Sequence, residues 1–175
     1  MRMPLLLRLD ARDRALFSRL ALSDAAAPSS LRLWLAVTHL GGATSAILAV
    51  LVPLMLAGGE LRHAAELGAW SLALSHLVVQ VVKRSIGRPR PTRARLGRSL
   101  ISMPDRFSFP SGHACAAMAV AFAYGMSMPG LAVPLTLLAV IVGMSRVRLG
   151  VHYPGDVLAG EAIAIVTVLG FWTLG

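Results

Sequence analysis

The chain has 175 residues, a length that fits a single domain. Hydrophobic residues make up 56% of it, charged residues only 14%, and the mean hydropathy is +0.70, which argues against an ordinary soluble domain. The formal charge of +9 comes with few aromatic residues and with arginines at the borders of apolar segments, so it indicates a membrane surface and anionic lipid rather than nucleic acid.

Residues 1–30 are predicted to form an amphipathic segment that lies in the membrane interface. One helical stripe is apolar while the opposite face is charged, which is the pattern of an interfacial helix. The stripe comprises Leu9, Leu16, Phe17 and Leu20. The run Leu5–Leu7 is too short to be the core of a signal peptide. Residues 25–30 then read as a linker into the first apolar segment.

Residues 31–175 are predicted to form a membrane-embedded domain, an all-α bundle of about five transmembrane helices. The apolar segments are Leu31–Ala57, Ala64–Val82, His113–Met128, Leu131–Met144 and Val157–Leu174. The third and fourth are at the short end of the ~17–25 residues that a bilayer requires. If each segment crosses the membrane, the second ends, the third begins, the fourth ends and the fifth begins on one side.

Three polar fragments lie at those ends, at residues 83–91, 110–113 and 145–156. Together they contain the residue types needed to hold a phosphate, attack it and protonate the group that leaves. Because the predicted topology brings all three to one face of the bundle, they form a candidate site.

The second fragment, Pro110-Ser111-Gly112-His113, opens a helix. Free backbone N–H groups and the positive end of the helix dipole suit a phosphate there. Gly112 permits close approach to the backbone, Ser111 adds a hydroxyl donor, and His113 can carry a proton near neutral pH. An ordinary helix start would also explain these four residues.

In the third fragment His152 precedes Asp156 by four residues. A carboxylate on one imidazole nitrogen fixes the tautomer and leaves the other nitrogen nucleophilic. The alternative is a helix-capping aspartate beside an interfacial histidine. Lys83, Arg90 and Arg146 can neutralise phosphoryl oxygens. Interfacial anchoring is the alternative for each of them, and it accounts for some of Arg84, Arg88, Arg93, Arg95 and Arg98.

The three fragments resemble the signature of the type 2 phosphatidic acid phosphatase superfamily. That signature is Lys, six residues, Arg-Pro; then Pro-Ser-Gly-His; then Ser-Arg, five residues, His, three residues, Asp. Every specified position is met, by Lys83, Arg90, Pro91, Pro110, Ser111, Gly112, His113, Ser145, Arg146, His152 and Asp156. Many members of the family have six spans, whereas five are counted in this chain.

The resemblance implies a role for each site residue. His152 would be the nucleophile that forms a phosphohistidine, and Asp156 would orient it. His113 would protonate the leaving alkoxide and then activate water. The phosphate would be held by Lys83, Arg90, Ser111, Gly112 and Arg146.

These patterns predict an integral-membrane lipid phosphatase that cleaves a phosphomonoester or pyrophosphate of an amphiphile. Phosphatidylglycerol phosphate, phosphatidic acid and polyprenyl phosphate or pyrophosphate fit equally well. Asp156 is the only acid close to the motif residues, so no metal and no cofactor are expected. The expected partners are a phosphorylated lipid and the bilayer, not nucleic acid. The alternative is a non-catalytic membrane module that binds or translocates a phosphorylated lipid.

Basic residues are distributed unequally between the two predicted faces. On the five-span topology 16 of the 17 fall on the face of the site, and Arg62 alone falls on the other. The positive-inside rule therefore predicts a cytoplasmic site in a bacterial-type inner membrane. The family resemblance favours the opposite side, because many of its bacterial members resemble enzymes with outward-facing sites.

Overall fold

The computed structural model describes residues 5–23, 25–91 and 105–174, and the regular elements in these ranges are helices. The all-α prediction is confirmed. In chain order the elements are α1 (Leu5–Leu20), α2 (Pro28–Leu40), α3 (Ala43–Leu56), α4 (Gly59–Ile86), α6 (Gly112–Ser127), the 3₁₀ turn η1 (Pro129–Leu131), α7 (Ala132–Arg148) and α8 (Pro154–Leu174).

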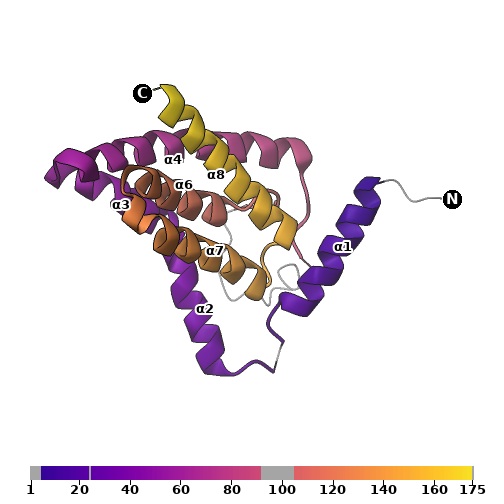
Figure 1. Cartoon of the computed structure of the whole chain (residues 1–175). Helices are drawn as coiled ribbons and strands as arrows, with labels where there is room; N and C mark the ends of the chain where they lie inside the picture. The colour runs from indigo at the N-terminus through magenta and orange to yellow at the C-terminus, as the bar shows by residue number, and fades with distance from the viewer. Residues whose placement is uncertain (1–4, 24, 92–104, 175) are drawn as a thin grey trace.

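Helix α6 forms the centre of the bundle and packs against α4, α7 and α8 (Figure 1). Its buried face consists largely of alanine, with Ala114, Ala119 and Ala123 fully covered. Small side chains let neighbouring helices approach closely, which is the usual basis of helix packing in membranes. Gly160 of α8 shows how close this approach is, because a Cβ there would collide with the Ser111 carbonyl at the start of α6.

The outer faces of the bundle are apolar. Large exposed side chains include Leu51 on α3, Leu77 on α4, Leu137 on α7 and Val166 on α8. Three helices, α4, α7 with its preceding η1 turn, and α8, are long and apolar enough to span a membrane, and α2 with α3 would make a fourth if counted together. An apolar exterior on helices of this length belongs to an integral membrane protein.

The first predicted span, Leu31–Ala57, is not one straight helix. It is divided into α2 and α3, which meet at an angle of 44°. Glycine has a low helix propensity, and two of them, Gly41 and Gly42, stand at the break. Gly41 is also required by packing, because a Cβ there would collide with Val142 and crowd the His113 carbonyl. The third predicted span, now α6, has only 16 residues, which agrees with its expected shortness.

The N-terminal helix α1 contacts α7 and α8. Phe17 and Leu20 of the predicted apolar stripe pack against a buried cluster formed by Ala114, Val147 and Val157. Leu16 is 46% exposed, and the side chain of Leu9 is outside the described residues. Part of the apolar stripe therefore packs against the helical bundle. The interfacial position of residues 1–30 stays a prediction.

Candidate active site

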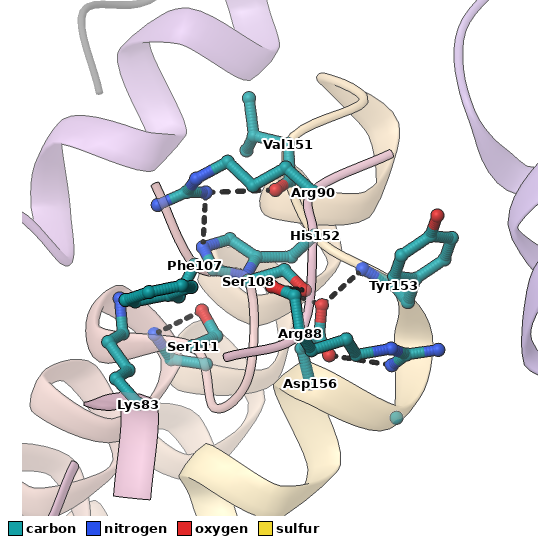
Figure 2. A network of polar contacts seen from close by, with 12 residues as sticks. Lys83, Arg88, Arg90, Phe107, Ser108, Ser111, Val151, His152, Tyr153 and Asp156 are labelled. Atoms are coloured by element: carbon teal, nitrogen blue, oxygen red, sulfur yellow. Dashed lines mark hydrogen bonds and ion pairs between the residues drawn. The ribbon is translucent and has the colours of Figure 1, made fainter. Parts of the chain in front are cut away.

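The ends of four helices converge on one polar cluster, as the sequence predicted. Lys83 lies near the end of α4, Ser111 caps α6, Arg146 lies near the end of α7, and Asp156 lies in the first turn of α8. His152 lies in the short connection between α7 and α8. All five side chains are buried, so the cluster is enclosed by the bundle and not spread over its surface. Figure 2 shows four of them, Lys83, Ser111, His152 and Asp156.

His152 and Asp156 face each other in the interior. The distance from His152 Nδ1 to Asp156 Oδ2 is 3.6 Å, longer than a hydrogen bond, and Nδ1 has no hydrogen-bond partner among the described residues. Asp156 Oδ2 accepts a hydrogen bond of 2.8 Å from the Tyr153 amide. The carboxylate is therefore anchored locally, and a small movement would bring it into hydrogen-bonding contact with the ring.

The other ring nitrogen of His152 identifies the tautomer. Arg90 Nη1 lies 3.1 Å from His152 Nε2 (Figure 2). A guanidinium has only donors, so Nε2 must accept, and in the neutral ring the proton is then on Nδ1, facing Asp156. This leaves a lone pair on Nε2 in the direction of the cationic residues, as a nucleophile needs.

The surroundings of His152 keep its ring neutral. Burial is the largest effect and lowers the pKa. Asp156 opposes this, while the positive charges of Arg146 and Arg90 act in the same direction as burial. The net result is a pKa of about 4, below the ordinary value of 6.5. The lone pair on Nε2 is therefore present throughout the physiological pH range.

Lys83 and Arg90 converge on a carboxylate that the sequence reasoning did not assign to the site, that of Asp105. Its Oδ2 lies 2.6 Å from Lys83 Nζ, and its Oδ1 lies 2.8 Å from Arg90 Nη2. Burial acts against ionisation, but these two cations outweigh it and lower the pKa of Asp105. The carboxylate thus binds the two cations expected to hold phosphate. Its position five residues before Pro110 was the only signal in the sequence.

Arg146 is held by a residue that was also missed. Its Nη1 donates a hydrogen bond of 2.6 Å to the hydroxyl of Thr38, and its Nε has no partner among the described residues. Both side chains are almost fully buried. A threonine inside the apolar segment 31–57 was the available signal, since a buried hydroxyl needs a partner. Arg146 therefore retains donors that an anion could engage.

The start of α6 has the geometry expected of Pro110-Ser111-Gly112-His113. Ser111 is the N-cap, its side chain accepts from the Ala114 amide at 3.4 Å, and its own amide donates to the Asp156 carbonyl at 2.8 Å. This bond fixes the α6 N-terminus against α8. His113 is half-buried and lies near Arg146 and His152.

Arg88 and Arg90 come from one extended segment that follows α4. Gly87 ends that helix with a φ of +62°, a left-handed conformation that favours glycine. Pro89 then pairs with Phe107, and the Ser108 amide donates to the Arg88 carbonyl at 2.8 Å. The sequence reasoning grouped Arg88 with the interfacial arginines. In the structure Arg88 Nη1 instead donates to Asp156 Oδ1 at 2.7 Å.

An apolar cleft with a volume of about 370 Å³ lies between α3, α4 and α6. Its lining includes Ala46, Ala73, His76 and Ala116. Ala116 is three residues after His113, so the cleft reaches within about one helical turn of a residue of the polar cluster.

Residues 67–175 match the model of the PAP2 superfamily. The chain belongs to this superfamily. Over 144 residues it is 33% identical to phosphatidylglycerophosphatase B of Bacillus subtilis, with 74% of this chain and 68% of that protein covered. The PAP2 family resemblance read from the three fragments is thereby confirmed.

Two further comparisons extend this result. Over 90 residues the chain is 36% identical to decaprenylphosphoryl-5-phosphoribose phosphatase of Mycobacterium tuberculosis, covering 51% of this chain and 49% of that protein. It therefore spans about half the length of this curated relative. Its fold is similar to the crystal structure of the transmembrane PAP2 type phosphatidylglycerolphosphate phosphatase from Bacillus subtilis, with a TM-score of 0.74, 24% identity, and coverage of 95% of this chain and 87% of the other.

Proposed function

We propose that this PAP2 protein is a membrane lipid phosphatase that works through a covalent phosphohistidine on His152. The observation that carries the proposal is the arrangement around His152 Nε2. A neutral, buried ring directs this nitrogen toward Arg90, while Asp156 lies behind the opposite nitrogen. Arg146 and Lys83 add positive charge nearby, which suits the developing charge on a transferring phosphoryl group.

In the first step His152 Nε2 attacks phosphorus. The phosphate oxygens take over the donors of Arg90 and Lys83, which frees the Nε2 lone pair. A P–N bond forms, the bond from phosphorus to the lipid oxygen breaks, and His113 donates a proton to that leaving oxygen. Asp156 stabilises the positive charge that develops on the ring.

In the second step water replaces the histidine. His113, now neutral, accepts a proton from a water molecule, whose oxygen attacks phosphorus. The P–N bond breaks, neutral His152 is restored, and inorganic phosphate leaves. For a pyrophosphate substrate the leaving group of the first step is the lipid monophosphate, and the other events are unchanged.

The substrate is proposed to be a phosphorylated amphiphile. The relatives carry the names of phosphatases for a polyprenyl-linked sugar phosphate and for phosphatidylglycerophosphate. The apolar cleft that reaches Ala116, about one helical turn after His113, suits a hydrocarbon chain. The test is release of inorganic phosphate by purified protein from phosphatidylglycerol phosphate, phosphatidic acid, and undecaprenyl phosphate and pyrophosphate. If the purified protein hydrolyses none of these lipids, the proposal is contradicted.

A non-catalytic module that binds or translocates a phosphorylated lipid is the second candidate. The anion-binding cations would serve it equally well, but it has no need of a carboxylate behind His152. In the panel above, such a module would retain a lipid phosphate without releasing phosphate. The His152→Ala variant would then bind the lipid phosphate as the wild type does, and neither protein would release inorganic phosphate.

We also propose that the site faces the cytoplasm of a bacterial-type inner membrane, on the strength of the charge distribution. Two exposed positions test this in a Cys115→Ser background: Gly58, before α4, and Arg106, beside the site. In intact cells an impermeant thiol reagent should label Gly58→Cys and spare Arg106→Cys. The reverse labelling would place the site on the outer face.

A further inference from the structure

Behind the His152–Asp156 pair lies a second charged cluster, which joins the N-terminal helix to the site. Arg88 donates three hydrogen bonds of 2.7 Å, to Asp156 Oδ1, to Asp13 Oδ2 and to Asp10 Oδ1. The side chain of Arg88 is only 14% exposed, and that of Asp156 is fully buried. An arginine in this position is an internal partner and does not act as an interfacial anchor.

The bond from Arg88 fixes the rotation of the Asp156 carboxylate. Oδ1 is held by Arg88, and Oδ2 is held by the Tyr153 amide. With one bond on each oxygen the carboxylate cannot turn about its terminal bond, so Oδ2 stays directed at His152 Nδ1 (Figure 2). Without Arg88, Oδ1 would be a buried oxygen without its charged donor, and the carboxylate could rotate away from the ring.

Arg88 and Arg90 act on the two residues of the pair from one segment. Side chains two residues apart in an extended segment point to the same side. Arg90 contacts His152 and Arg88 contacts Asp156, at 3.1 Å and 2.7 Å. The segment after Gly87 therefore sets the positions of the ring and the carboxylate together.

Helix α1 supplies the other contacts of Arg88. Asp13 also accepts a hydrogen bond of 2.8 Å from the Gly155 amide, at the start of α8. The Arg88 guanidinium lies over the Tyr153 ring at 4.2 Å, and Phe17 packs edge-on against the same ring. The Leu22 amide donates to the Arg148 carbonyl at 2.9 Å. These contacts attach α1 and the residues just after it to both ends of the connection that contains His152.

The charge balance of the cluster explains why two carboxylates of α1 are present. A guanidinium paired with Asp156 alone would neutralise most of the negative charge that His152 needs behind it. Asp10 and Asp13 share the Arg88 guanidinium, and Arg14 pairs with Asp10 at 2.7 Å. Two guanidiniums therefore face three carboxylates, and the cluster keeps a net negative charge. Arg88 can then position Asp156 while the carboxylate still stabilises a positive ring.

We propose that Arg88 is a positioning residue for the His152–Asp156 pair, and that α1 takes part in catalysis by holding Arg88 through Asp10 and Asp13. This inference rests on the proposed function, because it assumes that His152 is the nucleophile. It assigns the N-terminal helix a role in the reaction, in addition to any contact with the membrane.

The test compares Arg88→Met with Arg88→Lys and with a matched control, Arg84→Met. Arg84 is exposed and lies on α4, four residues before Arg88. kcat and KM are measured in detergent micelles with the fastest substrate of the lipid panel. Arg88→Met should lower kcat on the order of 10- to 100-fold with KM within about twofold, the size expected when reacting groups are slightly displaced. Arg88→Lys should recover part of kcat, and Arg84→Met should resemble the wild type.

A merely structural role would lower the amount of folded protein without this separation of kcat from KM. If Arg88→Met does not fold, the double variant Asp10→Asn with Asp13→Asn provides the test, because it leaves Arg88 in place and should lower kcat several-fold at unchanged KM. An unchanged kcat in the folded variant, with His152→Ala inactive, would overturn the inference and leave the proposed function intact. Activity in His152→Ala would overturn both.

Discussion

The two sides of the His152–Asp156 pair are built differently. The phosphate-facing side has three cations, Lys83, Arg90 and Arg146, with Asp105 as their one carboxylate partner among the described residues. The rear side has Arg88 surrounded by three carboxylates. The first side therefore has an excess of cations that suits an anion, whereas on the second side each charge is paired within the protein and a net negative charge remains. In the proposed mechanism this difference separates the residues that would bind substrate from those that would hold the catalytic groups.

The largest effect should follow removal of the two histidines on the phosphate-facing side. His152→Ala should abolish turnover, because no other group in the described part of the chain is placed to attack. His113→Ala should lower kcat by ~10²–10⁴-fold, the usual cost of losing a general acid and base. Phosphate release is measured, with size-exclusion chromatography as the control for folding. Substantial turnover by folded His152→Ala would show that the nucleophile is misassigned.

A smaller effect is expected at Asp105, the carboxylate that occupies Lys83 and Arg90. Asp105→Asn should strengthen inhibition by inorganic phosphate and by vanadate several-fold, since the anion no longer competes with a carboxylate. The lowered pKa of Asp105 means that it stays ionised from pH 5 to 8, so the gain should not vary over this range. Inhibition constants for the variant and wild type provide the measurement. Weaker inhibition in the variant would mean that Asp105 helps to hold the cations in place.

The pH dependence of phosphoenzyme formation should be shallow. Burial and the nearby arginines lower the pKa of His152 to about 4, so the ring stays neutral as the pH falls through the ordinary value of 6.5. In single turnovers with saturating lipid and the His113→Ala variant, in which the general acid no longer titrates, the rate should fall less than about threefold from pH 7 to pH 5. An unperturbed histidine would be about 76% neutral at pH 7 and about 3% neutral at pH 5, which corresponds to a fall of roughly 25-fold. The steeper fall would contradict the environment described for the ring.

No effect is expected from chelation, because side-chain cations and a helix N-terminus provide the positive charge at the phosphate-facing side. Activity in EDTA should equal activity in buffer. Vanadate, which can adopt the five-coordinate shape of the transferring group, should inhibit under both conditions. Recovery of a chelator-inactivated preparation on addition of magnesium or zinc would show that a metal shares this role.

The phosphate-facing side was largely predictable from sequence, whereas the rear side was not. Lys83, Arg90, His113 and His152 stand at fixed spacings next to apolar segments, so counting spans brings them together. Arg88 looked like any other arginine in a basic loop, because its partners Asp10 and Asp13 lie 78 and 75 residues away in the chain. Contacts between such distant segments depend on how α1 packs against the bundle, and sequence periodicity does not predict that packing.

The fold shows a similar division. The apolar runs located the membrane helices and predicted an all-α bundle, because each run is bounded by polar or turn residues and approaches the length of a span. It did not predict the bend at Gly41 and Gly42, where packing against Val142 excludes a side chain. Thr38 and Asp105 were missed for a related reason. Each is a single polar residue whose role depends on a cation supplied by another helix.

The central claim is that His152 becomes phosphorylated, and direct isolation of the phosphoenzyme tests it. Protein mixed with ³²P-labelled lipid substrate is quenched in alkali within milliseconds, and the labelled peptide is identified by mass spectrometry. The account predicts an acid-labile, alkali-stable phosphate on His152 that is absent in His152→Ala and accumulates in His113→Ala, where hydrolysis of the intermediate is slowed. Label on another residue, or full turnover in the wild type without any phosphoenzyme, would contradict it.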